Sequence, residues 1–272
     1  VAWWGWHLLR LLAYAVAFVF VVRAVHHTQQ INERMRSRAE LLSRSNDHLQ
    51  EFAQIASHDL QEPLRSVSNF LQLIKRRHHD RLDAQGVEWI DIAVNAAERM
   101  KQLIEDLLAY SRVQSRAAPF QSVRAHEALQ DAIARLKAAI DETNAVITYD
   151  PLPVVIADRT QLVQVFQNLL SNAIKYRSQE KPQIHVAAAM QNGSAVFSVK
   201  DNGIDIDLKH VKDIFRVFTR LHTKAEYSGT GIGLAICRGV IERHGGRIWT
   251  LSETGGGSTF YFTIPKQHPK DQ

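Results

Sequence analysis

A change of pattern near residue 115 divides this 272-residue chain into two parts that fold by different rules. Between residues 28 and 113, Pro63 and Gly86 are the only residues that break helices, and the apolar residues recur at helical spacing. After the stretch from Ser115 to Pro119, short apolar runs with the character of strands alternate with helical segments. The sequence therefore predicts a helical domain joined by a linker to a domain of strands and helices.

The composition is that of a folded protein and excludes several classes of function. Hydrophobic residues make up 45% of the chain and charged residues 22%. Cys237 is the single cysteine, so no intramolecular disulfide can form, and a reducing compartment is expected. The formal net charge is +5, but the basic residues are spread along the chain, so we expect no nucleic acid partner.

The first 25 residues differ from the rest of the chain. Three tryptophans precede an uncharged run from Leu11 to Val22, although a span of about 20 apolar residues also has to accommodate Arg10. Basic residues follow from Arg23 onwards, on the side expected to be cytoplasmic. We predict a transmembrane helix over residues 1–25, truncated from a longer protein, and a location in the cell inner membrane with the folded domains in the cytoplasm. A signal-peptide segment and an interfacial amphipathic helix stay open as alternatives.

The helical part is expected to contain a linker and a hairpin. Residues 26–50 carry an imperfect heptad pattern and are predicted to form a coiled coil. Residues 51–114 hold two helices joined by a turn at 78–85, where Asp83 is a plausible helix cap. Both helices have an apolar stripe, and a single antiparallel pair cannot bury both. We therefore predict that two hairpins pair into a four-helix bundle, which implies a homodimer.

The second predicted domain is an α/β sandwich over residues 119–266, followed by a tail at 267–272. Asn192-Gly193 is a hairpin signal between two of its strands. Strands are predicted at 120–123, 145–149, 154–157, 184–190, 195–199, 247–251 and 259–264, and helices at 124–141, 159–176 and 231–244.

His58 is the candidate nucleophile of the helical domain. It lies two residues from Leu60 on the predicted buried stripe, roughly 200° around the helix, and so is expected to face solvent. Asp59 can accept a hydrogen bond from the N–H of the other ring nitrogen or act as a base. Such a pair by itself is typical of a solvated surface, and Pro63 in the same helix calls for a reason such as a local bend.

Amides, glycines and a carboxylate of the second domain have the spacing of a nucleotide site. Asn168 and Asn172 share a helix face, and an amide oxygen next to phosphates suits Mg²⁺. Asp201 follows a predicted strand, where ligands commonly bind. The Gly229–Leu234 segment precedes a helix whose N-terminal amides can hold phosphate. Gly255–Gly257 has no such helix after it and is predicted to be a hairpin turn.

Taken in order, Ala56–Arg65, Asn168–Tyr176 and Gly229–Leu234 resemble the motifs of sensor histidine kinases of two-component systems, most closely the phytochrome-like branch. The resemblance covers residues 50 to 265. It implies an α + α/β chain, in which a dimerising phosphoacceptor hairpin precedes an ATP-binding domain of the GHKL type. It also implies that ATP phosphorylates His58 with help from Asp59, and that the phosphoryl group passes to an aspartate in the receiver domain of a response regulator.

The resemblance further implies roles at the nucleotide site. Asn172 would bind Mg²⁺ with support from Asn168, and Lys175 would reach the phosphates. Tyr176 would pack on adenine, Asp201 would accept a hydrogen bond from the adenine amino group, and Gly203 would permit close approach. Other expected contacts are Arg220 near the γ-phosphate, the loop residues Gly229, Thr230, Gly231, Ile232, Gly233 and Leu234, and Thr259 on the adenine side. Phe215 and Phe218 would anchor a mobile lid, or would be plain core.

Two positions depart from the family pattern. Asp205 stands where the family has a glycine, and Glu62 where phosphatase-competent members carry Thr or Asn. A side chain at a position that needs positive φ or close packing, or a carboxylate near a triphosphate, would weaken ATP binding. An alternative function is therefore a scaffold that dimerises and docks a regulator without phosphorylating itself. A third is an ATPase of the chaperone and topoisomerase superfamily, which leaves the His58 hairpin unexplained.

Overall fold

A computed structural model describes residues 18, 20, 23, 25–30, 33, 35, 37, 59–78, 82–115, 118–207, 209, 211, 213–219, 229–252 and 255–266. The chain forms two compact units, Val1–Phe52 and Ala53–Gln272. In the first unit the described residues are helical and exposed. None of the described helices is both long enough and apolar enough to cross a membrane. Most of the predicted membrane helix at 1–25 and of the coiled coil at 26–50 lies outside the described residues, so neither gains support.

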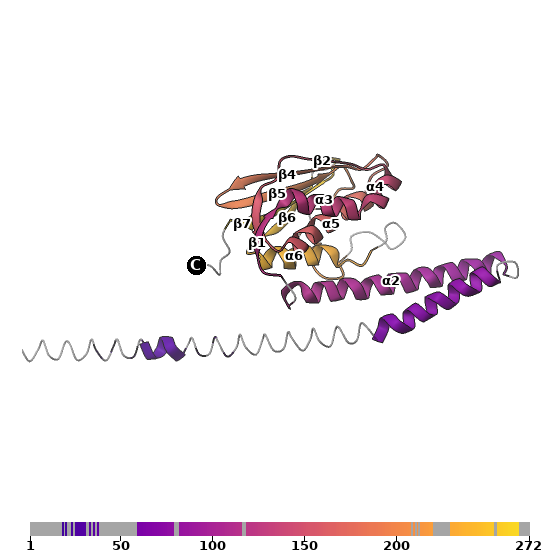
Figure 1. The fold of residues 1–272 in the computed structure, drawn as a ribbon, viewed down its shortest axis with the longest axis horizontal. Coiled ribbons are helices and arrows are strands. Elements are labelled where there is room, and N and C mark those ends of the chain that lie inside the picture. The colour runs from indigo at the N-terminus through magenta and orange to yellow at the C-terminus, as the bar shows by residue number, and fades with distance from the viewer. Residues whose placement is uncertain are drawn as a thin grey trace, which may run out of the picture. The chain divides into compact units, whose positions relative to one another are not determined.

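The second unit begins with a helical hairpin (Figure 1). Its first helix covers residues 59–77, and its second, α2, is Ala84–Ser115. The Oδ1 atom of Asp83 accepts a hydrogen bond from the N–H of Gly86 at 2.7 Å, which confirms the predicted cap. An ion pair between Lys75 and Asp91 joins the two helices.

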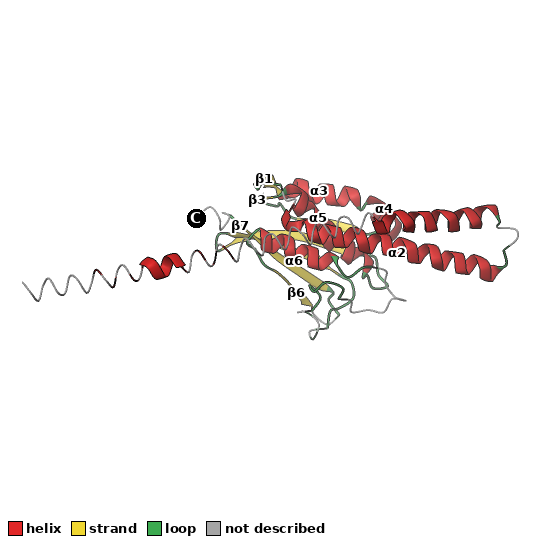
Figure 2. Cartoon of the chain, turned by 90° about the horizontal axis from the view of Figure 1, so that it is seen from below, coloured by secondary structure: helices red, strands yellow, loops and turns green. Residues whose placement is uncertain are grey.

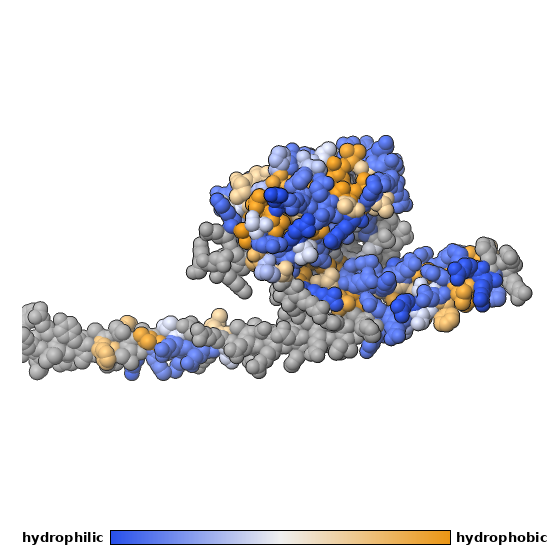
Figure 3. Space-filling view, in the orientation of Figure 1, coloured by the Kyte–Doolittle hydropathy of each residue, from blue (hydrophilic) through white to orange (hydrophobic). Residues whose placement is uncertain are grey.

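Large apolar side chains remain exposed on both helices of the hairpin. Trp89, for example, keeps 63% of its surface accessible. Figure 3 shows such hydrophobic residues at the surface of the hairpin. The exposed set is Leu60, Val67, Phe70, Ile74, Trp89, Ile92, Met100, Leu107 and Tyr110. As expected, one hairpin does not bury its own apolar stripes.

The remainder of the unit is an α/β sandwich built on a five-stranded sheet of order β2-β4-β5-β7-β6. β2 and β4 are parallel, and the other neighbouring pairs are antiparallel. Asn192 and Gly193 both have positive φ and form the predicted turn between β4 and β5. The strands are β2 Val146–Tyr149, β4 Gln183–Gln191, β5 Ser194–Asp201, β6 Ile248–Ser252 and β7 Ser258–Pro265. β1 (Gln121–Arg124) and β3 (Val154–Ala157) form a separate antiparallel pair.

Helices cover one face of the sheet, as Figures 1 and 2 show. They are α3 (Ala125–Arg135), α4 (Lys137–Thr143), α5 (Arg159–Lys175) and α6 (Gly233–Arg243). The sequence predicted a single helix over 124–141. The structure instead interrupts the helix at Leu136, whose φ of −96° and ψ of 6° depart from helical values. No glycine or proline marks this break.

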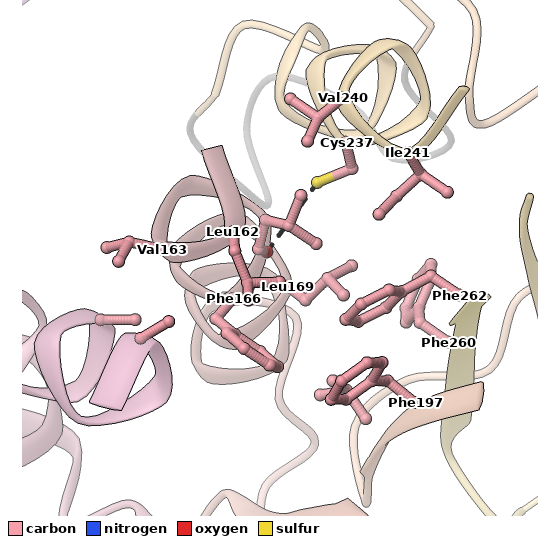
Figure 4. Close-up of a cluster of buried hydrophobic side chains, with 14 of the residues drawn as sticks. Leu162, Val163, Phe166, Leu169, Phe197, Cys237, Val240, Ile241, Phe260 and Phe262 are labelled. Atoms are coloured by element: carbon pink, nitrogen blue, oxygen red, sulfur yellow. Dashed lines mark hydrogen bonds between the residues drawn. The ribbon is translucent and has the colours of Figure 1, made fainter. Parts of the chain in front are cut away.

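The core lies between α5, α6 and the sheet (Figure 4). Phe166 of α5 makes edge contacts with Phe197 of β5 and Phe262 of β7, whose rings stack with centroids 4.8 Å apart. All three are fully buried, and burying a side chain of this size contributes about 2–3 kcal/mol each. Because this core fixes α5 against β5, it also fixes the side chains at the C-terminal ends of both elements.

Candidate nucleotide-binding site

A small apolar slot and a larger polar groove adjoin at one end of the sandwich. The slot has a volume of about 90 Å³, and Asp201, Ile204, Ile206, Ile214, Leu234, Ser258 and Phe260 are among its lining residues. The groove has a volume of about 690 Å³ and is lined by the glycine loop and by polar residues of α5 and α2. Asn172, Tyr176 and Leu234 line both, so the two form one continuous site. An apolar slot that opens into a polar groove suits a ligand with an aromatic end and a highly polar end.

Asp201 provides the carboxylate of the slot. It ends β5, is only 6% exposed, and accepts hydrogen bonds from the N–H groups of Gly203 at 2.9 Å and Ser258 at 3.4 Å. Burial raises the pKa of its carboxyl to about 6. The two N–H donors oppose this shift, and the charge of Asp205 contributes in the same direction as burial. The group is therefore mostly ionised at neutral pH and available to accept a hydrogen bond from a ligand.

Gly203 is required by close packing. A Cβ at this position would lie 2.4 Å from the carbonyl oxygen of Tyr176 and 2.9 Å from Oδ1 of Asp201. The same carbonyl of Tyr176 accepts the N–H of Ile204 at 2.9 Å. Any larger residue at 203 would push the slot loop away from the end of α5.

The end of α5 brings together four of the predicted residues. Asn168 donates from Nδ2 to the carbonyl oxygen of Gly233 at 3.2 Å, which ties α5 to the start of α6. Asn172 lies one turn further along and faces both the slot and the groove. The Nζ atom of Lys175 donates to the hydroxyl of Tyr176 at 3.0 Å and lies 4.4 Å from the centroid of its ring.

The glycine loop lies beside these residues. A Cβ on Gly229, whose φ is +148°, would come within 2.3 Å of the Nζ atom of Lys175. Gly231 and Gly233 line the groove, and α6 starts at Gly233, so the positive end of the helix dipole lies at the groove. The side chain of Ile232 is fully buried, so this residue can serve the site only through its backbone. The hydroxyl of Thr230 donates to Asp106 of α2.

Asp205 does not sit where the sequence argument placed it. Among the described residues, positive φ outside glycine occurs at Asn144, Asn192 and Phe218, so residue 205 has no need of glycine for its backbone. Its side chain lies outside the linings of slot and groove and bonds instead to the turn at 255–257. The expectation that Asp205 strains the backbone is therefore wrong. Its carboxylate lies in neither lining, although its charge still acts on Asp201 in the slot.

Thr259, which the family resemblance placed on the adenine side, does not line the slot. Side chains alternate along β7, and the structure assigns Ser258 and Phe260 to the slot, so Thr259 lies on the opposite face of the strand. Sequence reasoning also missed Ile204 and Ile206, although alternating apolar residues after a strand-end carboxylate could have indicated them. No local signal marked Asp106, which α2 contributes from far along the chain.

The lid is described only in part. Phe215 is buried in the core, whereas Phe218 is 61% exposed, so neither of the two expectations holds for both residues. The N–H of Phe218 donates to the carbonyl of Gly231 at 3.1 Å, which connects this end of the lid to the glycine loop. Arg220 and His58, the predicted phosphoacceptor, lie outside the described residues, and Asp59 is an exposed residue at the start of the hairpin.

Two protein-family models match the chain. Residues 48–116 match the His Kinase A (phospho-acceptor) domain. Residues 157–268 match the ATPase family described as histidine kinase-, DNA gyrase B- and HSP90-like. Together they cover more than half of the sequence and coincide with the hairpin and with the part of the sandwich that holds the slot.

Among curated proteins, cyanobacterial phytochrome A of Nostoc sp. is 54% identical over 224 residues, which are 82% of this chain and 29% of the relative. Phytochrome-like protein Cph1 of Synechocystis sp. is 46% identical over 86% of this chain and 31% of its own length. The chain thus spans less than a third of these relatives. Because they are phytochromes, the predicted location in the cell inner membrane is wrong.

Solved structures of histidine kinases share the fold. Full-length ShkA in complex with AMPPNP gives a TM-score of 0.61 at 25% identity over 79% of this chain and 45% of that one. Histidine kinase ThkA in complex with the response regulator protein TrrA gives a TM-score of 0.56 at 26% identity over 81% of this chain and 62% of that one. The similarity extends across both the hairpin and the sandwich.

Proposed function

The chain belongs to the family of sensor histidine kinases, and on this premise we propose that it is a protein histidine kinase that uses ATP to phosphorylate His58. The phosphoryl group would then pass to an aspartate in the receiver domain of a response regulator. The observation that carries the proposal is the continuous site itself, in which an apolar slot with a buried carboxylate opens into a groove at a helix N-terminus.

The slot supports adenine as the aromatic end of the ligand. The carboxylate of Asp201 would accept a hydrogen bond from the exocyclic amino group, and the apolar side chains that line the slot would contact the faces of the base. Tyr176 lies where the slot meets the groove and closes the slot on the α5 side. A guanine base, which has a carbonyl in place of that amino group, would set an oxygen against the ionised carboxylate.

The groove supports the triphosphate. The start of α6 offers positively polarised amide groups, and the ammonium of Lys175 lies against the backbone of Gly229 at the groove wall. Lys175 would turn from the ring of Tyr176 towards the phosphates when the nucleotide binds. Gly229 keeps this space open, since a side chain there would collide with the ammonium.

The site also fits Mg²⁺. This ion prefers oxygen ligands and usually retains several waters while it binds substrate phosphates, so it needs few oxygen ligands from the protein. Asn172 faces the groove and can supply that oxygen, whereas Asn168 is engaged with Gly233 and would act by fixing α5 against α6. When bound, the ion neutralises the charge that develops on the phosphates during transfer.

The transfer itself requires a neutral imidazole at His58. One ring nitrogen forms a bond to the γ-phosphorus while the bond from that phosphorus to the bridging oxygen breaks and ADP leaves. Asp59 would hold the proton of the other ring nitrogen and stabilise the positive charge of the ring. Arg220 in the lid would contact the γ-phosphate, as the family resemblance implies.

We further propose that the chain acts as a homodimer with hairpins paired in a four-helix bundle. The apolar side chains exposed on the hairpin, among them Trp89 and Ile92, supply the surface that such a bundle buries. The scaffold stays the alternative function. It rested on Asp205, and the kinase is favoured here because that carboxylate lies outside the linings of the slot and groove.

Incubation with γ-labelled ATP and Mg²⁺ tests the proposal. The unchanged chain should acquire label that acid removes and base does not, and His58→Gln should abolish it. His78→Gln, in the hairpin turn, is the matched control and should leave labelling intact. If the chain binds ATP but stays unlabelled, the kinase proposal fails and the scaffold replaces it.

A further inference from the structure

The carboxylate of Asp205 occupies a small anion-binding site made by the chain itself. Its Oδ2 atom accepts the N–H of Gly255 at 2.6 Å, and its Oδ1 atom accepts the N–H of Gly257 at 3.1 Å. Both glycines have positive φ, +76° and +78°, in the turn between β6 and β7. Backbone N–H groups that converge in such a turn form a concave nest for an anion, and the side chain fills it from 50 residues away.

The same turn is attached to the loop that forms the base slot. A Cβ on Gly257 would lie 2.1 Å from the carbonyl oxygen of Asp201, so the two backbones are in direct contact. The hydroxyl of Ser252 accepts the N–H of Ile206 at 3.0 Å and donates to the carbonyl of Gly257 at 3.1 Å. The hydroxyl of Ser258 donates to the carbonyl of Ile204 at 3.4 Å.

The loop faces the slot with some side chains and contacts the turn with its backbone and with Asp205. Asp201, Ile204 and Ile206 point into the slot, and Asp205 lies among them but reaches the turn instead. A carboxylate that accepts two N–H groups is the strongest of these attachments, because the charge strengthens both hydrogen bonds. Without it, the loop would be held to the turn and the start of β7 by hydroxyl contacts, by the longer hydrogen bond from the N–H of Ser258 to Asp201 at 3.4 Å, and by van der Waals packing.

We propose that Asp205 is a positioning residue for nucleotide recognition. By holding the 255–257 turn against loop 201–206, it fixes Asp201 and the two isoleucines in the geometry that accepts adenine. The inference rests on the proposed function, since it concerns ATP binding at that site. It reverses the expectation from sequence: a glycine at 205, the residue usual in the family, leaves the nest empty in this chain and weakens binding.

Three variants of the whole chain test the inference. Asp205→Gly removes both hydrogen bonds, and Asp205→Asn keeps one acceptor without the charge. Asp207→Asn is the matched control, because this neighbouring carboxylate accepts only the N–H of Lys209 among the described contacts. Titration with AMPPNP and with a guanine analogue gives the affinities, and hydrogen exchange of the peptide that contains Gly255 and Gly257 reports on the turn.

Asp205→Gly should bind AMPPNP about threefold to tenfold more weakly, because only part of the free energy of the two lost hydrogen bonds, made at an exposed position, acts on the slot. Asp205→Asn should lie between it and the unchanged chain. Selectivity for adenine over guanine should fall together with affinity, which a loss of stability alone would not produce. The turn peptide should exchange faster in both variants, and Asp207→Asn should match the unchanged chain in every measurement.

Equal or tighter AMPPNP binding by Asp205→Gly would overturn the inference while leaving the kinase proposal in place. Failure of the unchanged chain to bind AMPPNP would instead refute the proposed nucleotide site. If, in addition, the turn peptide exchanged at the same rate in Asp205→Gly as in the unchanged chain, the contact between Asp205 and the two glycines would also be refuted.

Discussion

Replacement of Asp201 by Asn tests the reasoning about the slot because it separates ligand recognition from stability. Burial raises the pKa of this carboxyl from 3.8 in the unfolded chain to about 6 in the folded one, so the folded state binds a proton more tightly. Stability from this group is greatest below about pH 4 and falls as the pH rises through 6. Above that pH, the ionised carboxylate costs up to about 3 kcal/mol.

Asp201→Asn should therefore raise the free energy of unfolding of the nucleotide-free chain by about 1–3 kcal/mol at pH 8, with the gain vanishing near pH 4. The same variant should bind AMPPNP at least about tenfold more weakly, since the amide lacks the charge that the adenine amino group contacts. Urea denaturation at several pH values and nucleotide titration measure the two effects. Asp207→Asn serves as the exposed control and should show neither.

A gain in stability that stayed constant between pH 4 and pH 8 would contradict the assignment of the shift to burial of Asp201. Lower stability at pH 8 would show that the carboxylate is held mainly by its N–H donors rather than penalised by burial. Unchanged AMPPNP affinity together with the expected stability profile would place the base of the ligand elsewhere.

Four further predictions concern single residues. Gly203→Ala should destabilise the fold by about 1–3 kcal/mol and weaken AMPPNP binding, because its methyl group meets the rigid carbonyl of Tyr176. Gly239→Ala in α6, with only ordinary contacts, should stabilise by about 0.5–1 kcal/mol in the same thermal denaturation series. Asp158→Ala should cost about 2–3 kcal/mol in urea denaturation, since this buried side chain caps α5 and also accepts the N–H of Ala118 in the linker. Cys237 is fully buried, and burial raises the pKa of its thiol to about 12. Iodoacetamide at pH 8 should therefore modify it about a hundredfold more slowly in the native chain than in concentrated urea. Comparable rates would refute its burial.

The order of secondary structure was predictable because it depends on local patterns. β3 was predicted at its observed bounds and α5 to within one residue, since a strand of alternating burial and an amphipathic helix each leave a periodic signal. The break at Leu136 was missed because no residue there disfavours helix, so packing of the two halves has to impose it. Asn168, Asn172 and Lys175 were found because three- and four-residue spacing places them on one face of α5.

The sequence by itself determined which elements form and which residue types gather near the ends of α5, β5 and α6, because periodicity and motif spacing are properties of neighbouring residues. Tertiary structure alone decided where individual side chains point once distant segments meet. Thr259 lost its place in the slot to Ser258 and Phe260 through strand register, and Asp106 reached the glycine loop through the packing of α2 against α6. Asp205 is the clearest case: its neighbours in the sequence suggested a harmful charge beside phosphates, whereas the fold supplies two backbone donors from a distant turn.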